Sequence, residues 1–301
     1  MTDDARIVAE GLRFPEGPVV MPDGALVVCE MAAGFLTRID PADGSAARIA
    51  ETGGGPNGAA LGPDGKLYVC NNGAWPMVEV GPLLIPADVN QGHDYSGGTI
   101  QRVDPATGEV EVVYDGLKSP NDIAFDGHGG FWFTDYGKQR ARDEDRGVLY
   151  YGRPDGAPLV DAVHELLRPN GVGLSPDGGT VYVAETPTAR LWAWEVTGPG
   201  EVVKGRPFGN GGRLVAGLGG LQYFDSLAVA ADGRICVATL VNAGITVVAP
   251  DGSEVEHLPL PPACTDPLPT NLCFTGDTAY VTLSATGRVM GCTWPGSVVP
   301  S

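Results

Sequence analysis

Apolar and polar positions along the chain alternate in short runs that repeat around a tight turn. Each repeat has a first apolar run, a turn of the Asp-Gly type and a second run rich in β-branched residues, which predicts a β-hairpin. Six such units occur, at residues 14–30, 55–71, 119–135, 168–185, 223–239 and 269–284. A unit that recurs in this way indicates a repeat architecture.

Further apolar runs follow the hairpins and predict a third and a fourth strand for each unit, for example at residues 190–196 and 213–217. Six units of four strands predict an all-β fold, a six-bladed β-propeller with four antiparallel strands per blade. Residues 6–11 look like a fourth strand with no blade of their own. We therefore expect this N-terminal strand to complete the blade that begins at Asn271, within a single propeller domain over residues 1–301.

One segment departs from the repeat. Residues 73–98 lack the two-residue alternation of a strand and are rich in Gly, Pro and aromatic residues. A long ordered loop more often covers a site than serves as a mere connector. We expect this insertion to lie over the channel face of the propeller, where His93 is a candidate substrate contact.

Composition agrees with a folded β protein and narrows its partners. The 45 Gly and 26 Pro among 301 residues argue against a mainly helical chain. The formal net charge of −18 disfavours nucleic acid and anionic membranes as partners, leaving a small-molecule substrate. No apolar stretch is long enough for a transmembrane helix, and the first residues carry acids where a signal peptide has a basic start. The expected location is therefore cytoplasmic, and the oligomeric state is not predicted.

When the six units are placed in register, one polar residue stands at the start of each hairpin. These residues are Glu16, Asn57, Asn121, Asn170, Asp225 and Asn271. In the first five units the turn residue follows seven positions later, so the alignment needs no gaps. A propeller brings the first strand of every blade to its axis, and the six side chains should therefore meet around one channel.

Carboxylate and amide oxygens are the donors that Ca²⁺ prefers, and they also serve Mg²⁺, Mn²⁺ or Zn²⁺. Any one of these residues alone would be explained by turn formation, the commonest use of Asn and Asp. Six coincident positions instead favour a site for one divalent cation, with Ca²⁺ as the first choice.

A second set of polar residues lies about fourteen positions further on, where the second strand returns to the same face. Its members are Glu30, Asn71, Asp135, Glu185, Thr239 and Ser284. Asp135 and Glu185 are candidates for moving a proton or orienting the first set. An exposed charge at a strand end is the alternative, and for Glu30 it is the better explanation.

The motifs at the heads of four repeats resemble a known family. FPEGP at 14–18, SPND at 119–122, RPNG at 168–171 and FDS at 224–226 look like the senescence-marker-protein/gluconolactonase family. Diisopropyl fluorophosphatase and the paraoxonases share its general architecture. The resemblance implies a calcium-dependent six-bladed propeller that hydrolyses lactones and binds its metal through Glu16, Asn170 and Asp225, with Asn121 as a further ligand or substrate contact.

The resulting hypothesis is a metal-dependent lactonase. The cation would polarise the lactone carbonyl, water would attack, and a carboxylate would take the proton: Asp225 first, with Glu185 or Asp135 as alternatives. Asn57 or Asn271 would donate a hydrogen bond to the substrate. Two other hypotheses remain open on the same residues. One is a metal-dependent aryl-ester or phosphotriester hydrolase, or a metal-enolate isomerase or hydratase. The other is a non-enzymatic propeller that binds a partner.

Overall fold

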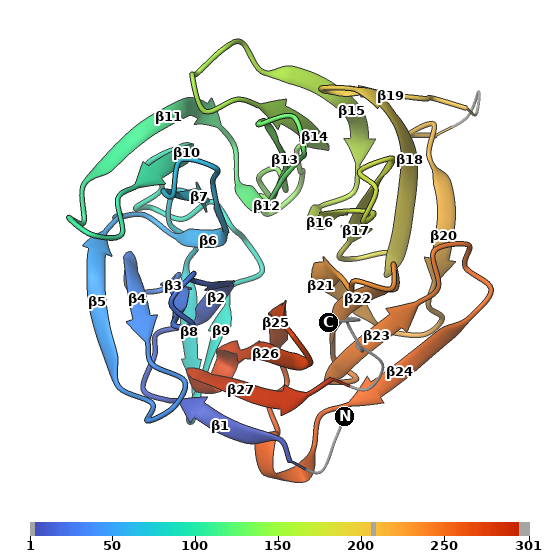
Figure 1. Ribbon diagram of the computed structural model, residues 1–301. Coiled ribbons are helices and arrows are strands. Elements are labelled where there is room, and N and C mark those ends of the chain that lie inside the picture. The colour runs from blue at the N-terminus through green and yellow to red at the C-terminus, as the bar shows by residue number, and fades with distance from the viewer. Residues whose placement is uncertain (1–3, 206–208, 295–301) are drawn as a thin grey trace.

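The computed structural model describes residues 4–205 and 209–294, which form β-strands and two short 3₁₀ turns. Six antiparallel sheets stand around a central axis (Figure 1), which confirms the six-bladed propeller. Within these residues no helix is long and apolar enough to cross a bilayer.

Each blade is numbered by its order along the chain, and its first strand lies nearest the axis (Figure 1). Blade 1 contains β2 (Pro15–Val20), β3 (Leu26–Glu30), β4 (Phe35–Ile39) and β5 (Ala46–Glu51). Blade 2 contains β6 (Pro56–Leu61), β7 (Leu67–Asn71), β10 (Gly98–Val103) and β11 (Val110–Leu117). Blade 3 contains β12 (Pro120–Phe125), β13 (Phe131–Asp135), β14 (Gly147–Gly152) and β15 (Val160–Leu166).

The other three blades follow the same plan with small differences. Blade 4 contains β16 (Pro169–Leu174), β17 (Thr180–Glu185), β18 (Arg190–Gly198), β19 (Glu201–Val202) and β20 (Arg213–Gly217). Blade 5 contains β21 (Tyr223–Val229), β22 (Ile235–Leu240), β23 (Gly244–Val248) and β24 (Val255–Pro259). Blade 6 contains β25 (Pro269–Thr275), β26 (Thr278–Leu283), β27 (Arg288–Thr293) and β1 (Arg6–Ala9). The turns η1 (Pro262–Cys264) and η2 (Ser284–Thr286) belong to the connections of blade 6.

Two features depart from four strands per blade. In blade 4 the short β19 and the regular fourth strand β20 both pair with β18, so this sheet has five strands. The insertion at 73–98 carries a hairpin of its own, β8 (Met77–Val80) and β9 (Leu83–Pro86), where the sequence showed no strand alternation.

The ring closes as the sequence predicted. The first strand, β1, pairs antiparallel with β27, with Arg6 opposite Gly291 and Ile7 opposite Met290. This pairing confirms that the last blade is completed by the N-terminal strand. It also covers the edge of β27, which would otherwise expose unpaired backbone groups.

The hydrophobic core consists of the interfaces between neighbouring blades. For example, Val27 and Leu36 of blade 1 pack in one cluster with Leu67 and Val103 of blade 2. A blade therefore buries both of its faces, which explains why β3 is buried along its whole length and reads as a continuous apolar run. The outer strand β5 is largely exposed.

The innermost strands approach each other so closely that glycine is needed beside the axis. Gly17 has a φ of +49°, and a Cβ added there would lie 2.3 Å from the backbone oxygen of Asn57. A Cβ on Gly58 would lie 2.5 Å from the backbone oxygen of Asn121. This close approach gives a physical reason for the Gly that follows Glu16 and Asn57, and it brings the residues before each Gly together.

Candidate active site

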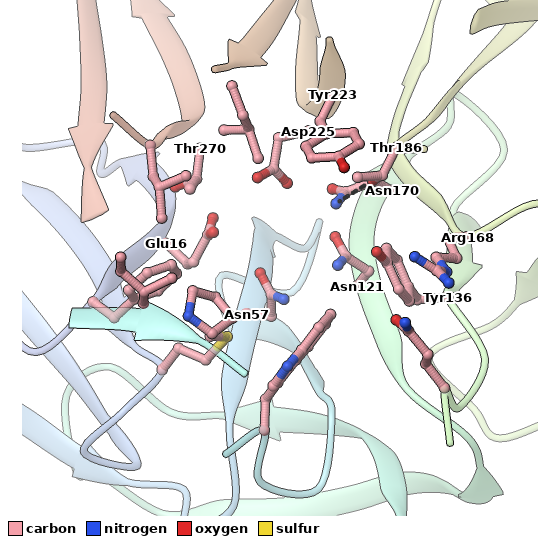
Figure 2. A pocket seen from close by; sticks show the side chains of 18 of the residues that line it. Glu16, Asn57, Asn121, Tyr136, Arg168, Asn170, Thr186, Tyr223, Asp225 and Thr270 are labelled. Carbon is pink, nitrogen blue, oxygen red and sulfur yellow. Dashed lines mark hydrogen bonds between the residues drawn. The ribbon is translucent and has the colours of Figure 1, made fainter. Parts of the chain in front are cut away.

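The innermost strands end in a cavity of about 500 Å³ on the axis of the propeller. Its floor is formed by one residue from each blade, the second residue of β2, β6, β12, β16 and β25 and the third of β21. These floor residues are Glu16, Asn57, Asn121, Asn170, Asp225 and Thr270. Figure 2 shows their side chains gathered around a common space. All six side chains belong to residues that are nine-tenths or more buried.

Three oxygens of the floor have no hydrogen-bond partner although they are buried: Oε2 of Glu16, Oδ1 of Asn57 and Oδ1 of Asn121. Asn170 is different, because its Oδ1 accepts a hydrogen bond from Ser226 over 3.3 Å. Its Nδ2 donates to Thr186 over 3.2 Å (Figure 2). Buried polar atoms normally have partners, and unpaired ones require an explanation. Together with the Asp225 carboxylate, these oxygens form a set of hard donors that suits a cation.

The pKa values of the floor carboxyl groups also favour a cation site. Burial and the neighbouring Asp225 carboxylate raise the pKa of Glu16 well above its ordinary value. Burial also raises the pKa of Asp225 to about 7, and that of Asp122, which follows Asn121 in β12, to about 7. The Glu16 and Asp225 carboxyl groups resist ionisation because they are buried next to each other. A divalent cation between them would stabilise both as anions. The described residues contain no cluster of three His, Cys, Asp or Glu, so such a cation would depend on amide oxygens as well.

The sixth floor position differs from the sequence-based expectation. Thr270 lines the cavity, whereas Asn271 is not among the lining residues and its Oδ1 accepts a hydrogen bond from the backbone of Leu272 over 2.7 Å. The sequence contained the signal for this register. Asp277 follows Thr270 by seven positions, the same spacing as in the other five units. Aligning on the Asn side chain instead shifted the sixth unit by one residue.

The second set of polar residues does not line the cavity. The Asp135 carboxylate accepts hydrogen bonds from the backbone N–H groups of Lys118, Ser119 and Gly137 at 2.7–3.1 Å. The Glu185 carboxylate accepts one from the backbone of Leu167 and one from the Thr188 hydroxyl, each over 2.8 Å. These carboxylates therefore hold the segments that lead into the innermost strands of their own blades, β12 and β16, and they lie outside the cavity.

Glu30 and Asn71 act in the same way as Asp135, whereas Ser284 is a donor and bonds to the neighbouring blade. Oε2 of Glu30 accepts a hydrogen bond from the backbone of Arg13, and Oδ1 of Asn71 accepts from the backbone of Gly55. Ser284 donates to the backbone oxygen of Pro15, the first residue of β2. Glu30 is buried, not an exposed strand-end charge as the sequence favoured.

The insertion supplies part of the cavity wall through Trp75, Ile85, Pro86, Ala87 and Asp88. His93 also belongs to the insertion, but it does not line the cavity. Its side chain is fully exposed and lies 3.4 Å from the carboxylate of Asp94. The structure thus does not bring His93 to the floor residues.

The wall beside blades 3 and 4 contains residues that the sequence did not single out. Tyr136, Arg168, Thr186 and Tyr223 line the cavity (Figure 2). Arg168 is the one cation among the described lining residues, and its guanidinium lies 2.7 Å from the carboxylate of Glu144. Burial raises the pKa of Tyr136 to about 12, so its hydroxyl stays protonated at neutral pH. Their positions do recur in the repeat, because Arg168 and Tyr223 each stand two residues before a floor residue, and Tyr136 and Thr186 each follow a member of the second set. The residue types at these positions differ between blades, so no common side chain marked them.

The match to a family model decides the classification of the chain. Residues 14–285, which include all six floor positions, match the model of the SMP-30/Gluconolactonase/LRE-like region. The chain belongs to this family. The resemblance expected from the four repeat motifs is therefore confirmed.

Named members of the SMP-30/gluconolactonase group and related proteins show how close the similarity is. The chain is 31% identical over 204 residues to a gluconolactonase of Zymomonas mobilis, covering 62% of this chain and 55% of the relative. It is 28% identical over 180 residues to the diisopropyl-fluorophosphatase of Loligo vulgaris, covering 55% and 53%. The matched regions thus span about half the length of these curated relatives.

Among solved structures, the fold is shared with a calcium-binding protein, regucalcin, of Agrobacterium tumefaciens. The TM-score is 0.72 at 18% identity, and the alignment covers 95% of this chain and 92% of that one. At this identity the likeness concerns the propeller fold. The six-bladed architecture is therefore a property that this chain shares with that protein.

Proposed function

We propose that this protein is a divalent-metal-dependent hydrolase that opens a lactone to a hydroxy acid. The observation that carries the proposal is the set of unpaired buried oxygens on Glu16, Asn57 and Asn121 beside the Asp225 carboxylate. Similarity to a gluconolactonase supports the substrate class, and the calcium-binding regucalcin fold supports Ca²⁺ as the first choice of cation.

The residues present fit a divalent cation. Glu16, Asn121, Asn170 and Asp225 would hold it, with two carboxylates matching its charge and two amides adding oxygens without like-charge repulsion. A bound cation would supply electrophilic polarisation of the substrate carbonyl. Mg²⁺, Mn²⁺ and Zn²⁺ remain alternatives to Ca²⁺ because they accept the same kinds of donor.

The side chains of the cavity would carry out the remaining steps. Asp225 would accept the proton of the attacking water, because its carboxylate faces the cavity beside the other floor residues. The amide nitrogen of Asn57 would donate a hydrogen bond to the substrate. The protonated hydroxyl of Tyr136 would offer a further donor at the cavity wall.

A second candidate activity is hydrolysis of a phosphotriester or aryl ester on the same floor. The specific observation in its favour is the 28% identity to diisopropyl-fluorophosphatase. Water attack at phosphorus would need the same electrophilic cation and the same proton acceptor as attack at a lactone carbonyl.

The deciding experiment combines metal analysis with a substrate panel. Purified protein would be analysed for bound metals, stripped with a chelator and assayed for acid release from lactones, aryl esters and organophosphates after addition of Ca²⁺, Mg²⁺, Mn²⁺ or Zn²⁺. We expect lactone opening that disappears on chelation and returns with one of these ions. Turnover that survives chelation, or a preference for organophosphates over all lactones, would contradict the proposal.

A further inference from the structure

The cavity has two chemically different sides. The floor and the lining near blades 3 and 4 are mostly polar. Blades 1 and 6 and the insertion, which also contributes Ala87 and Asp88, present six apolar residues: Phe14, Met31, Trp75, Ile85, Pro86 and Leu268. We call these six residues the apolar wall. Four of them, Phe14, Met31, Trp75 and Leu268, belong to a single hydrophobic cluster with Leu84, so the wall is a continuous surface.

The apolar wall is held in place from several directions. Leu84 of β9 is buried against Phe14 and Met31 of blade 1. The indole of Trp75 donates a hydrogen bond to the backbone oxygen of Ala87 over 3.0 Å, which fixes the two ends of the insertion's hairpin to each other. The Trp75 ring also contacts the Tyr136 ring edge-on, at 5.3 Å between centroids.

The far end of the insertion is tied to blade 3. The ammonium of Lys138 donates to the backbone oxygens of Asn72 and Asn90 over 3.0 Å each and lies 3.9 Å from the centre of the Tyr95 ring. The amide of Asn90 in turn donates to the backbone oxygen of Gly137 over 3.0 Å. The wall is therefore a built part of the cavity.

A polyhydroxylated ring would fit this cavity poorly. Hydroxyl groups that face the apolar wall would lose their hydrogen bonds to water and find no partner there. An alkyl or aryl substituent in the same place would instead leave water and contact the wall. A volume of about 500 Å³ has room for a small lactone ring and such a substituent.

From this geometry we infer that the substrates are lactones with an apolar substituent, which the insertion selects by packing it against the apolar wall. This inference rests on the proposed lactonase function. It assigns the selectivity to Trp75 and Ile85 of the insertion, outside the blade repeats, while the floor residues serve the reaction itself.

The test compares γ-lactones whose alkyl substituents grow from methyl to hexyl with glucono-δ-lactone, using the metal-loaded protein. We expect kcat/KM to rise about four-fold for each added methylene, the factor that corresponds to burial of one CH₂. Ile85→Ser should flatten this dependence. The matched control is Val78→Ser, because Val78 pairs with Ile85 in the same hairpin but is 48% exposed and does not line the cavity. The control should keep the dependence of the native protein.

Equal turnover of all chain lengths, a preference for glucono-δ-lactone, or the same effect of both serine substitutions would overturn the inference. Calorimetric binding of the corresponding alkyl γ-lactams, which resist hydrolysis, separates this failure from a failure of the proposed function. If no lactone is opened, the lactonase proposal fails. The lactams then still test whether the apolar wall binds the substituent. A Kd that falls with chain length supports this binding, and a constant Kd overturns it.

Discussion

The ammonium of Lys138 donates a hydrogen bond to the backbone oxygen of Asn90 over 3.0 Å and so joins blade 3 to the insertion that forms part of the cavity wall. Lys138 is only 2% exposed, and its second hydrogen bond, to Asn72, is made at the other end of the same insertion. One side chain therefore bonds to the backbone at both ends of the segment 72–90, which has 19 residues.

Lys138→Met should loosen the insertion, because the backbone oxygens of Asn72 and Asn90 lose their donor. We expect the free energy of unfolding to fall by about 1–3 kcal/mol, the loss for buried groups left unpaired. Urea denaturation measures this, and hydrogen exchange should become faster within residues 72–98. The control, Lys118→Met, changes an exposed lysine and should stay within about 0.5 kcal/mol of the native protein. Equal stability of the two variants would contradict the role of Lys138.

The same lysine predicts a pH dependence of stability. Burial lowers its pKa from 10.5 to about 8. Between these values the unfolded chain binds a proton that the folded chain does not, so the contribution of Lys138 to the free energy of unfolding rises as the pH increases from about 8 to about 10.5. Below that window both states hold the proton and the contribution is constant. Urea denaturation at pH 7, 8, 9 and 10 should show that the difference in free energy of unfolding between the native protein and Lys138→Met grows with pH. A difference that stays constant over this range would contradict the prediction.

Cation binding should stabilise the fold through the floor oxygens. At a free ion concentration of 100 times Kd, the free energy of unfolding should rise by about 2.7 kcal/mol. In Asn121→Ala this gain should shrink. The same variant without ions should be about as stable as the native protein, because the oxygen that it removes is unpaired. Asn242→Ala, at an exposed position, is the control and should keep the full gain. A loss of stability in ion-free Asn121→Ala would indicate a structural role instead.

Asp135 and Asp225 should give opposite results when each is replaced by Asn. Asp135→Asn weakens the carboxylate's bonds to three backbone N–H groups, so we expect a loss of about 2–3 kcal/mol in stability with near-native turnover per folded molecule. Asp225→Asn should keep the stability of the ion-free protein and lower kcat by about 10²–10⁴-fold, the usual contribution of a general base. Unfolding curves and kinetics on the same samples test both. If Asp135→Asn remains stable but loses turnover, the Asp135 carboxylate takes part in the reaction.

The repeat pattern was sufficient to predict the propeller, its six blades and its closure by residues 6–11. Each blade buries both faces against its neighbours, and this burial imposes the same apolar pattern on every unit. Five of the six floor residues followed from that register. The sixth was misplaced because Asn271 resembles the other amides, while Thr270 holds the equivalent position.

Other parts of the site depend on contacts that a repeat does not encode. In the sequence, Asp135 and Glu185 belong to the second set of polar residues. Whether such a carboxylate contacts water or backbone N–H groups depends on the path of the preceding connection, which the repeat does not encode. The insertion gave no strand signal because β8 and β9 contain only four residues each, and neither alternates between buried and exposed positions. Arg168 and Tyr136 hold positions that recur in the repeat, but the residue types at these positions vary from blade to blade and gave no common signal.

The pairing of β1 with β27 has a consequence for how the protein is made on the ribosome. Glu16 and Thr270 face the same cavity from blades 1 and 6, on the two sides of this seam, yet more than 250 residues separate them along the chain. A nascent chain therefore has no complete floor until its last blade has emerged, and contacts over such distances form slowly. The proposed ion and substrate sites are thus completed only when the last blade has folded.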